Sequence, residues 1–140
     1  MWYLRKTDPL SAILGNKHVS FVGGGGKTSF AEGLAVRALQ QGRSVAITTT
    51  TKIWARPPFA TLDHGPWQGD GRFLRIGKTE EKGKLTGLLP EEVEAIGNDF
   101  DLVLNEADGA KGMPLKYPAS FEPVIPSCTE LIVIVAGLDS

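Results

Sequence analysis

The apolar positions of the chain fall into two repeating patterns, one typical of strands and the other of helices. Short segments of strand length that are rich in apolar residues occupy residues 18–22, 44–47, 101–104 and 131–136. Between the first two runs, the spacing of apolar residues predicts a helix over 30–41. The residues predicted to face the sheet are Phe30, Ala31, Leu34, Ala35, Ala38 and Leu39, and those predicted to face away are Glu32, Arg37, Gln40 and Gln41. The first strand, this helix and the second strand therefore form a unit whose two strands are expected to be parallel.

Two shorter helices are predicted from residues that favour helix starts. Asp8 can cap a helix and Pro9 suits its first position, so residues 9–14 are expected to be helical, with Gly15 as the stop. The segment 90–96 also begins with proline and carries glutamates in its first turn, where the helix dipole favours them.

The region between the second strand and the second short helix is irregular. Prolines and glycines are frequent from 55 to 71, and two short strands are predicted at 73–76 and 84–88. Together the elements predict one α/β domain over residues 1–140, with a small β insertion around 57–89. We expect a three-layer sandwich around a mainly parallel sheet of about four core strands.

The strongest chemical signal is a run of glycines between the first strand and the long helix. Glycines allow a tight loop whose N–H groups point inward, and the following helix start adds free donors and a favourable dipole. The lysine after them can neutralise β- and γ-phosphate oxygens, and the next hydroxyl can ligate Mg²⁺. The predicted nucleotide-binding residues are Gly23, Gly24, Gly25, Gly26, Lys27, Thr28 and, more weakly, Ser29. These features make the fold P-loop NTPase-like.

The loop is shorter than the common P-loop. Phe21 stands where the first glycine of the common pattern would be, and the remaining G-x-x-G-K-T resembles the compact ATP loop of the Mur-ligase group. A dinucleotide-binding pattern fits less well, because Thr28 occupies its third glycine and that pattern has no use for Lys27.

A second chemical signal follows the apolar run at 101–104. Glu106 and Asp108 come at the carboxyl end of that strand, two positions apart, so both are expected to point the same way. Acids at such a strand end commonly hold Mg²⁺, directly or through water. Either acid can be the metal-side group, with the other orienting water as a base. The predicted metal site therefore comprises Thr28 with Glu106 or Asp108, and the predicted catalytic residues are Lys27, Glu106 and Asp108.

Two further lysine-containing motifs lead to opposite expectations. The run from Thr48 to Lys52 ends the second strand on the ligand side of an open α/β sheet, so Thr50 and Lys52 are predicted to touch the substrate. The sequence 77–79 repeats the letters G-K-T but has no glycine-rich approach and no helix after it. We predict no phosphate binding there.

Composition excludes several classes of protein. The 140 residues carry 15 Lys and Arg against 16 Asp and Glu, for a net charge of −1, so no basic surface indicates nucleic-acid binding. The longest apolar run, 131–136, is too short to cross a membrane, and the first residues do not have the pattern of a signal peptide. A cytoplasmic location without membrane or nucleic-acid partners is therefore expected. Because an α/β domain usually continues with a helix after such a strand, we also expect that the chain lacks a C-terminal part.

Several motifs, in the same order, resemble the YqeC family. They are Val22 to Ser29, Thr48 to Lys52, Glu106 to Lys116, Glu122 to Pro126 and Gly137 to Asp139. The block that starts at Glu106 is the most specific of them. YqeC proteins are described as accessory proteins of selenium-dependent molybdenum hydroxylases, in selenium cofactor biosynthesis.

The resemblance implies a P-loop-like nucleotide-binding protein with partners among molybdenum-cofactor enzymes or their maturation proteins. It also implies that Lys111 and Lys116 contact the substrate, and that the natural protein continues beyond Asp139. The interpretation that follows is an accessory protein that binds ATP or GTP with Mg²⁺ and hydrolyses it or transfers a phosphoryl group. The alternatives are a Mur-ligase-like ATP-dependent ligase and a non-catalytic carrier of an anionic, molybdopterin-type cofactor. Whether the protein is an enzyme stays open at this stage.

Overall fold

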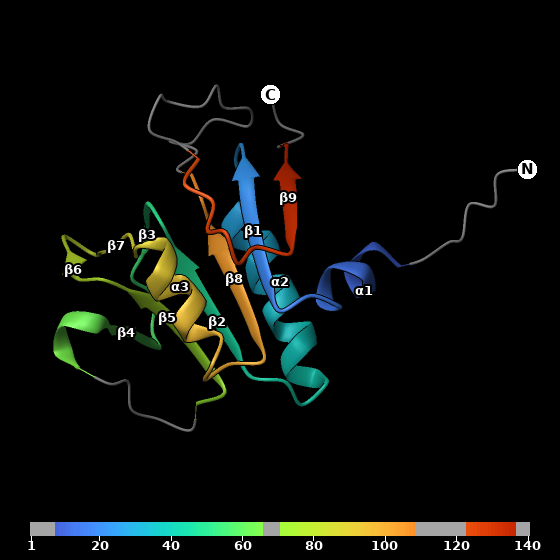
Figure 1. Cartoon of the computed structure of the whole chain (residues 1–140), viewed down its shortest axis with the longest axis horizontal. Helices are drawn as coiled ribbons and strands as arrows, with labels where there is room; N and C mark the ends of the chain where they lie inside the picture. The colour runs from blue at the N-terminus through green and yellow to red at the C-terminus, as the bar shows by residue number, and fades with distance from the viewer. Residues whose placement is uncertain (1–7, 66–70, 109–122, 137–140) are drawn as a thin grey trace, which may run out of the picture.

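A parallel sheet of six strands forms the centre of the molecule. The computed structural model describes residues 8–65, 71–108 and 123–136. The strand order is β4-β5-β2-β8-β1-β9, and every neighbouring pair in it is parallel. The carboxyl ends of β1, β8 and β9 therefore lie at one edge of the sheet (Figure 1). The strands of this sheet are β1 (His18–Gly23), β2 (Val45–Thr49), β4 (Phe59–Thr61), β5 (Phe73–Gly77), β8 (Leu102–Glu106) and β9 (Leu131–Val135).

Helices cover both faces of this sheet, which confirms the predicted three layers. The long helix α2 (Lys27–Gln40) packs its apolar side on one face, together with the short helix α1 (Pro9–Leu14). Helix α3 (Pro90–Ile96) covers part of the other face (Figure 1). Each face has its own apolar core, and burial of both explains why the central strands are apolar on both sides. The predicted start of α1 is also confirmed, because Asp8 accepts a hydrogen bond from the N–H of Leu10 at 3.2 Å.

The predicted small β insertion was partly wrong. Strand β5 pairs in parallel with β2, and β4 pairs with β5, so both belong to the main sheet. The separate small sheet is antiparallel and has the order β3-β7-β6. Its strands are β3 (Lys52–Trp54), β6 (Glu80–Glu81) and β7 (Lys84–Thr86), and a short 3₁₀ helix, Leu62–His64, follows β4. The spacing of apolar residues and the turn residues identified the strands, but these signals do not determine which sheet a strand joins.

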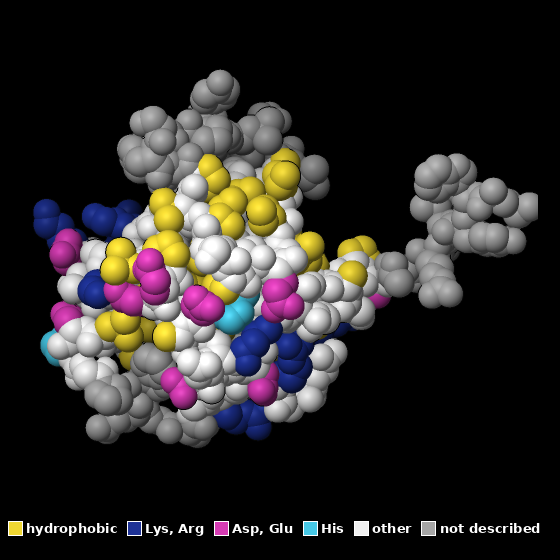
Figure 2. Space-filling model, viewed as in Figure 1, with side chains coloured by type: hydrophobic (Ala, Val, Ile, Leu, Met, Phe, Trp, Pro, Cys, Tyr) yellow, Lys and Arg dark blue, Asp and Glu magenta, His cyan; other side chains and the backbone are white. Residues whose placement is uncertain are grey.

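Strand β9 is a sheet edge with one exposed side, although an all-apolar run such as 131–136 is typical of a buried strand. Leu131, Val133 and Val135 pack on the core beside α2. Ile132 and Ile134 point the other way and are 48% and 78% exposed. Figure 2 shows apolar side chains on this side of the molecule, where β9 lies in Figure 1. An all-apolar strand reads as fully buried, but an edge position leaves the second face uncovered by the described residues.

Candidate functional site

The glycine loop joins the end of β1 to the start of α2. Gly26 has a φ of +97° and Gly23 a φ of +112°, both in the region that favours glycine. The N–H of Gly24 donates to the carbonyl of Val135 at 2.8 Å. A Cβ placed on Gly23 would lie 2.3 Å from that same oxygen, so the loop fits closely against the end of β9. Glycine is therefore required by conformation at Gly26 and by both conformation and space at Gly23.

The loop leaves donors free at the start of α2. The first hydrogen bond of the helix joins the N–H of Phe30 to the carbonyl of Gly26, at 2.9 Å. In the described part of the chain, no acceptor contacts the N–H groups from Gly25 to Thr28. A helix start with unpaired donors attracts anions, because the dipole and the donors act in the same direction.

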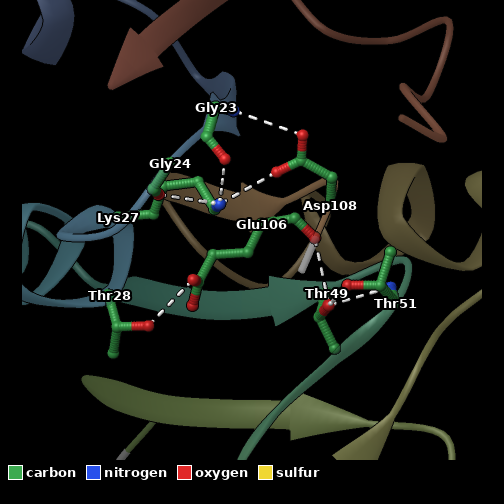
Figure 3. A network of polar contacts seen from close by, with 8 residues as sticks. All are labelled: Gly23, Gly24, Lys27, Thr28, Thr49, Thr51, Glu106 and Asp108. Atoms are coloured by element: carbon green, nitrogen blue, oxygen red, sulfur yellow. Dashed lines mark hydrogen bonds and ion pairs between the residues drawn. The ribbon is translucent and has the colours of Figure 1, made fainter. Parts of the chain in front are cut away.

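Lys27 is buried and fully paired. Its side chain is 3% exposed, and its ammonium donates to the carbonyls of Gly23 at 2.7 Å and Gly24 at 3.0 Å. The same nitrogen lies 2.9 Å from Asp108 Oδ1 (Figure 3). The ammonium therefore donates two hydrogen bonds, and its charge is paired with the carboxylate of Asp108, whose Oδ1 has no hydrogen-bond partner among the described residues.

Glu106 and Asp108 both reach the loop, as predicted, but they contact different residues. Glu106 is the last residue of β8, and its Oε1 accepts a hydrogen bond from the hydroxyl of Thr28 at 2.8 Å (Figure 3). Asp108 pairs with Lys27, and its Oδ2 accepts from the N–H of Gly23 at 3.2 Å. One acid thus faces the hydroxyl of Thr28, and the other faces the ammonium of Lys27.

The second oxygen of Glu106 has no hydrogen-bond partner among the described residues. This oxygen, Oε2, is buried, and Glu106 as a whole is only 4% exposed. Burial raises the pKa of Glu106, while the hydrogen bond from Thr28 and the charge of Lys27 lower it in part. A buried carboxylate oxygen without a donor is costly, and a cation beside it would relieve that cost.

The oxygen atoms of Thr28 and Glu106 are too few to complete a Mg²⁺ site, so a bound ligand must supply further oxygen atoms. The hydroxyl of Thr28 and the carboxylate of Glu106 are hard oxygen ligands of the kind that Mg²⁺ prefers. Among the described residues, no group of three or more His, Cys, Asp or Glu could hold a metal ion. A magnesium ion here would therefore take its remaining ligands from phosphate oxygens and water.

The threonines that end β2 have structural contacts. The hydroxyl of Thr49 donates to the backbone carbonyl of Glu106 at 3.0 Å, and the N–H of Thr51 donates to Thr49 Oγ1 at 2.9 Å. Thr50 Oγ1 donates to the carbonyl of Val124 at 2.6 Å. These bonds hold the end of β2 against β8 and fix the backbone of Glu106.

Among the described residues, neither Thr50 nor Lys52 forms a hydrogen bond or ion pair with the glycine loop. Lys52 is exposed at the start of β3. Lys111 and Lys116 lie outside the described residues, so their roles stay predictions, like that of Thr50. Ser29, the weakest of the predicted phosphate ligands, is the third residue of α2.

Glu32 lies where the sequence pattern did not place it. It was expected to face away from the sheet, but its Oε1 pairs with Arg75 of β5 at 3.0 Å and with Arg56 at 3.3 Å. The negative charge of Glu32 also contributes to the raised pKa of Glu106. Its place four residues after Thr28, on the same side of the helix, was the signal available in the sequence.

Comparison with known proteins gives a family and a similar protein from Escherichia coli. The profile of the family described as "YqeC protein" matches residues 19–140. The chain is 37% identical over 131 residues to "Uncharacterized protein YqeC" of Escherichia coli (strain K12), an alignment that covers 85% of this chain and 51% of that protein. The chain thus spans about half the length of this relative. No solved structure matches the chain, and no helix among the described residues is long and apolar enough to cross a membrane.

Proposed function

The chain belongs to the YqeC family, and we propose that it binds ATP or GTP with Mg²⁺ at the loop between β1 and α2. The observation that carries the proposal is the buried pair of Thr28 and Glu106 beside unpaired N–H groups at the start of α2. The N–H groups from Gly25 to Thr28 and the ammonium of Lys27 would hold the phosphates.

Each residue has a distinct role in this proposal. Thr28 and Glu106 would hold the metal, whose charge would offset the charge that develops on the transferred phosphoryl group. Lys27 would contact the terminal phosphates and stabilise the same charge. Asp108 would act as the counter-ion of Lys27 rather than as a metal ligand, since it contacts the ammonium and the N–H of Gly23.

The wider role that we propose is that of an accessory protein in the maturation of selenium-dependent molybdenum hydroxylases. It would use the nucleotide for hydrolysis or phosphoryl transfer, with a molybdenum-cofactor enzyme or its maturation proteins as partners. The family resemblance supports this role. Since the chain spans half of its relative, the activity and partners of the whole protein are part of the proposal.

The contact between Thr28 and Glu106 favours a triphosphate over the alternative of a non-catalytic carrier. A site for an anionic cofactor without metal gains nothing from a buried carboxylate beside its phosphate loop, because like charges repel. The ligase alternative uses the same nucleotide site. It differs in releasing phosphate only when a carboxylate substrate and an amine are both present.

Calorimetric titration of the chain with ATP and with GTP, with and without Mg²⁺, tests the proposal. We expect binding of at least one nucleotide that weakens at least about tenfold when Mg²⁺ is withdrawn. The Glu106→Gln variant should bind equally with and without Mg²⁺. Wild-type binding that is equally tight with and without Mg²⁺, and that is unchanged in Glu106→Gln, would favour the carrier. No binding by a folded chain would contradict the proposal.

A further inference from the structure

The ion pair of Lys27 and Asp108 places a protein carboxylate where the site would receive a phosphate. Asp108 is 4% exposed, and its two oxygens take the ammonium of Lys27 and the N–H of Gly23. An oxygen anion of a phosphate seeks the same two kinds of donor in a glycine loop. The carboxylate therefore occupies an anion subsite built from these two donors (Figure 3).

The position of Asp108 in the chain allows this contact. The N–H of Ala107 donates to the carbonyl of Phe21 at 2.9 Å, which continues the pairing of β8 with β1 by one residue. Asp108 follows at once, beside the residue where β1 ends. Its carboxylate meets the loop from the sheet side, while the unpaired N–H groups lie at the start of α2.

The charge of Lys27 is neutralised while this arrangement lasts. Its ammonium donates to the carbonyls of Gly23 and Gly24, and its charge is paired with the carboxylate of Asp108 at 2.9 Å. A phosphate that engages Lys27 must therefore compete with this carboxylate for the ammonium. Exchange is possible because a phosphate oxygen offers the ammonium an equivalent charge-assisted contact.

We propose that Asp108 is an internal anion that fills the terminal-phosphate subsite and leaves it only for a ligand whose last phosphate reaches Lys27. The inference rests on the proposed function and adds a competing internal anion to it. A nucleoside triphosphate exchanges with the carboxylate, whereas a nucleoside monophosphate, which is too short to reach Lys27, leaves the ion pair in place. Asp108 therefore lowers the affinity for triphosphates by competing with them and leaves the affinity for monophosphates unchanged.

The first test compares Asp108→Asn with the wild type by titration with ATP and with AMP, each with Mg²⁺. Asparagine keeps an oxygen that can accept from Gly23 but has no charge to hold Lys27. We expect the ATP affinity to rise about tenfold and the AMP affinity to change less than about twofold. Glu81→Gln, which removes an exposed charge on β6, is the control for net charge and should change neither affinity.

The second test uses the wild-type chain, so it does not depend on the folding of a variant. The amide proton of Gly23 is hydrogen-bonded to Asp108, and its NMR shift should move on saturation with Mg²⁺ and ATP but not with AMP. If the wild type binds ATP and Asp108→Asn binds it no more tightly, or if the Gly23 signal does not move, the inference is overturned and the proposed function stands. If neither the wild type nor Asp108→Asn binds ATP, both are overturned.

Discussion

The same three letters, G-K-T, occur twice in this chain and form two unrelated structures. Lys27 is 3% exposed at its side chain and is paired with a buried aspartate, whereas Lys78 is 47% exposed and pairs with Glu92 at 2.6 Å. Thr28 donates to a buried glutamate, whereas the hydroxyl of Thr79 lies 2.8 Å from that of Thr86 in a neighbouring strand. Only the first copy combines buried charges with free backbone donors.

The difference comes from the elements around each copy. Gly26 ends a glycine loop and precedes a helix of 14 residues that starts at the carboxyl edge of the main sheet. Gly77 ends β5, and the chain then reverses into the β6–β7 hairpin, where a Cβ on Gly77 would lie 2.6 Å from that of Leu85. The sequence G-K-T can form an anion site only where a central strand is followed directly by a helix. At that junction the free N–H groups and the helix dipole both point toward the loop.

The largest expected effect is that of Gly23→Ala on stability, since the close fit of the first loop depends on this residue. The substitution forces a Cβ to within 2.3 Å of the Val135 carbonyl at a φ of +112°. We expect the free energy of unfolding to fall by about 3 kcal/mol or more. Urea denaturation measures it, with Gly33→Ala as the control.

Gly33 lies inside α2, and a Cβ there has open space around it. Its replacement by alanine should raise the free energy of unfolding by about 0.5–1 kcal/mol. Equal effects of the two substitutions would mean that the loop does not pack against β9 as described.

The second prediction contrasts the two threonines in ligand binding. Thr28→Val removes a hydroxyl predicted to hold Mg²⁺ and should lower the magnesium-dependent affinity for nucleotide at least about tenfold. Thr79→Val removes the matching hydroxyl of the second copy and should change that affinity less than about twofold. Titration of both variants with nucleotide and Mg²⁺ measures the two affinities. Equal affinities would contradict a role of the Thr28 hydroxyl in binding the metal.

The third prediction concerns the pH dependence of stability. Burial raises the pKa of Glu106, so the unfolded chain loses this proton first as pH rises, and the wild type loses stability above the ordinary pKa of a glutamate, about 4.3. Glu106→Gln should therefore raise the free energy of unfolding by about 1 kcal/mol near neutral pH. The gain should disappear below that ordinary pKa, because the carboxyl is then protonated in both states.

Glu130 provides a control of opposite sign. Its Oε1 accepts from the N–H groups of Lys17 and His18 at the start of β1, and these bonds lower its pKa. Glu130→Gln should lower stability near neutral pH, and the loss should vanish as pH falls through the lowered pKa. The same sign for both variants would contradict the burial described for Glu106.

The smallest effect is expected for the lysine of the second copy. Lys78 forms a partly exposed ion pair with Glu92, so Lys78→Ala should lower the free energy of unfolding by at most about 0.5 kcal/mol. Thermal or urea denaturation measures it. A loss above about 2 kcal/mol would show that this pair is part of the core rather than of the surface.

The sequence was sufficient to predict the layers, the loop and the two acids near it. The spacing of apolar residues, the glycines and the strand ends are local signals in the sequence. They predicted β1, α2, β8 and the position of Glu106 at the carboxyl edge of the sheet. The partners of each side chain depend on contacts between distant segments. Nothing near Asp108 in the chain indicates that it pairs with Lys27 while Glu106 pairs with Thr28. For the same reason, the sheet to which β5 belongs was predicted wrongly, and the exposed side of β9 was not predicted.

The most direct test of the account is titration of Lys27→Ala and Lys78→Ala with ATP and with GTP in the presence of Mg²⁺. Both substitutions remove one lysine from the same three-letter motif and change the net charge equally. The account predicts that Lys27→Ala loses at least about a hundredfold in affinity for the nucleotide bound by the wild type, and that Lys78→Ala binds it like the wild type. Equal affinities of the two variants would contradict the claim that the loop between β1 and α2 is the phosphate site.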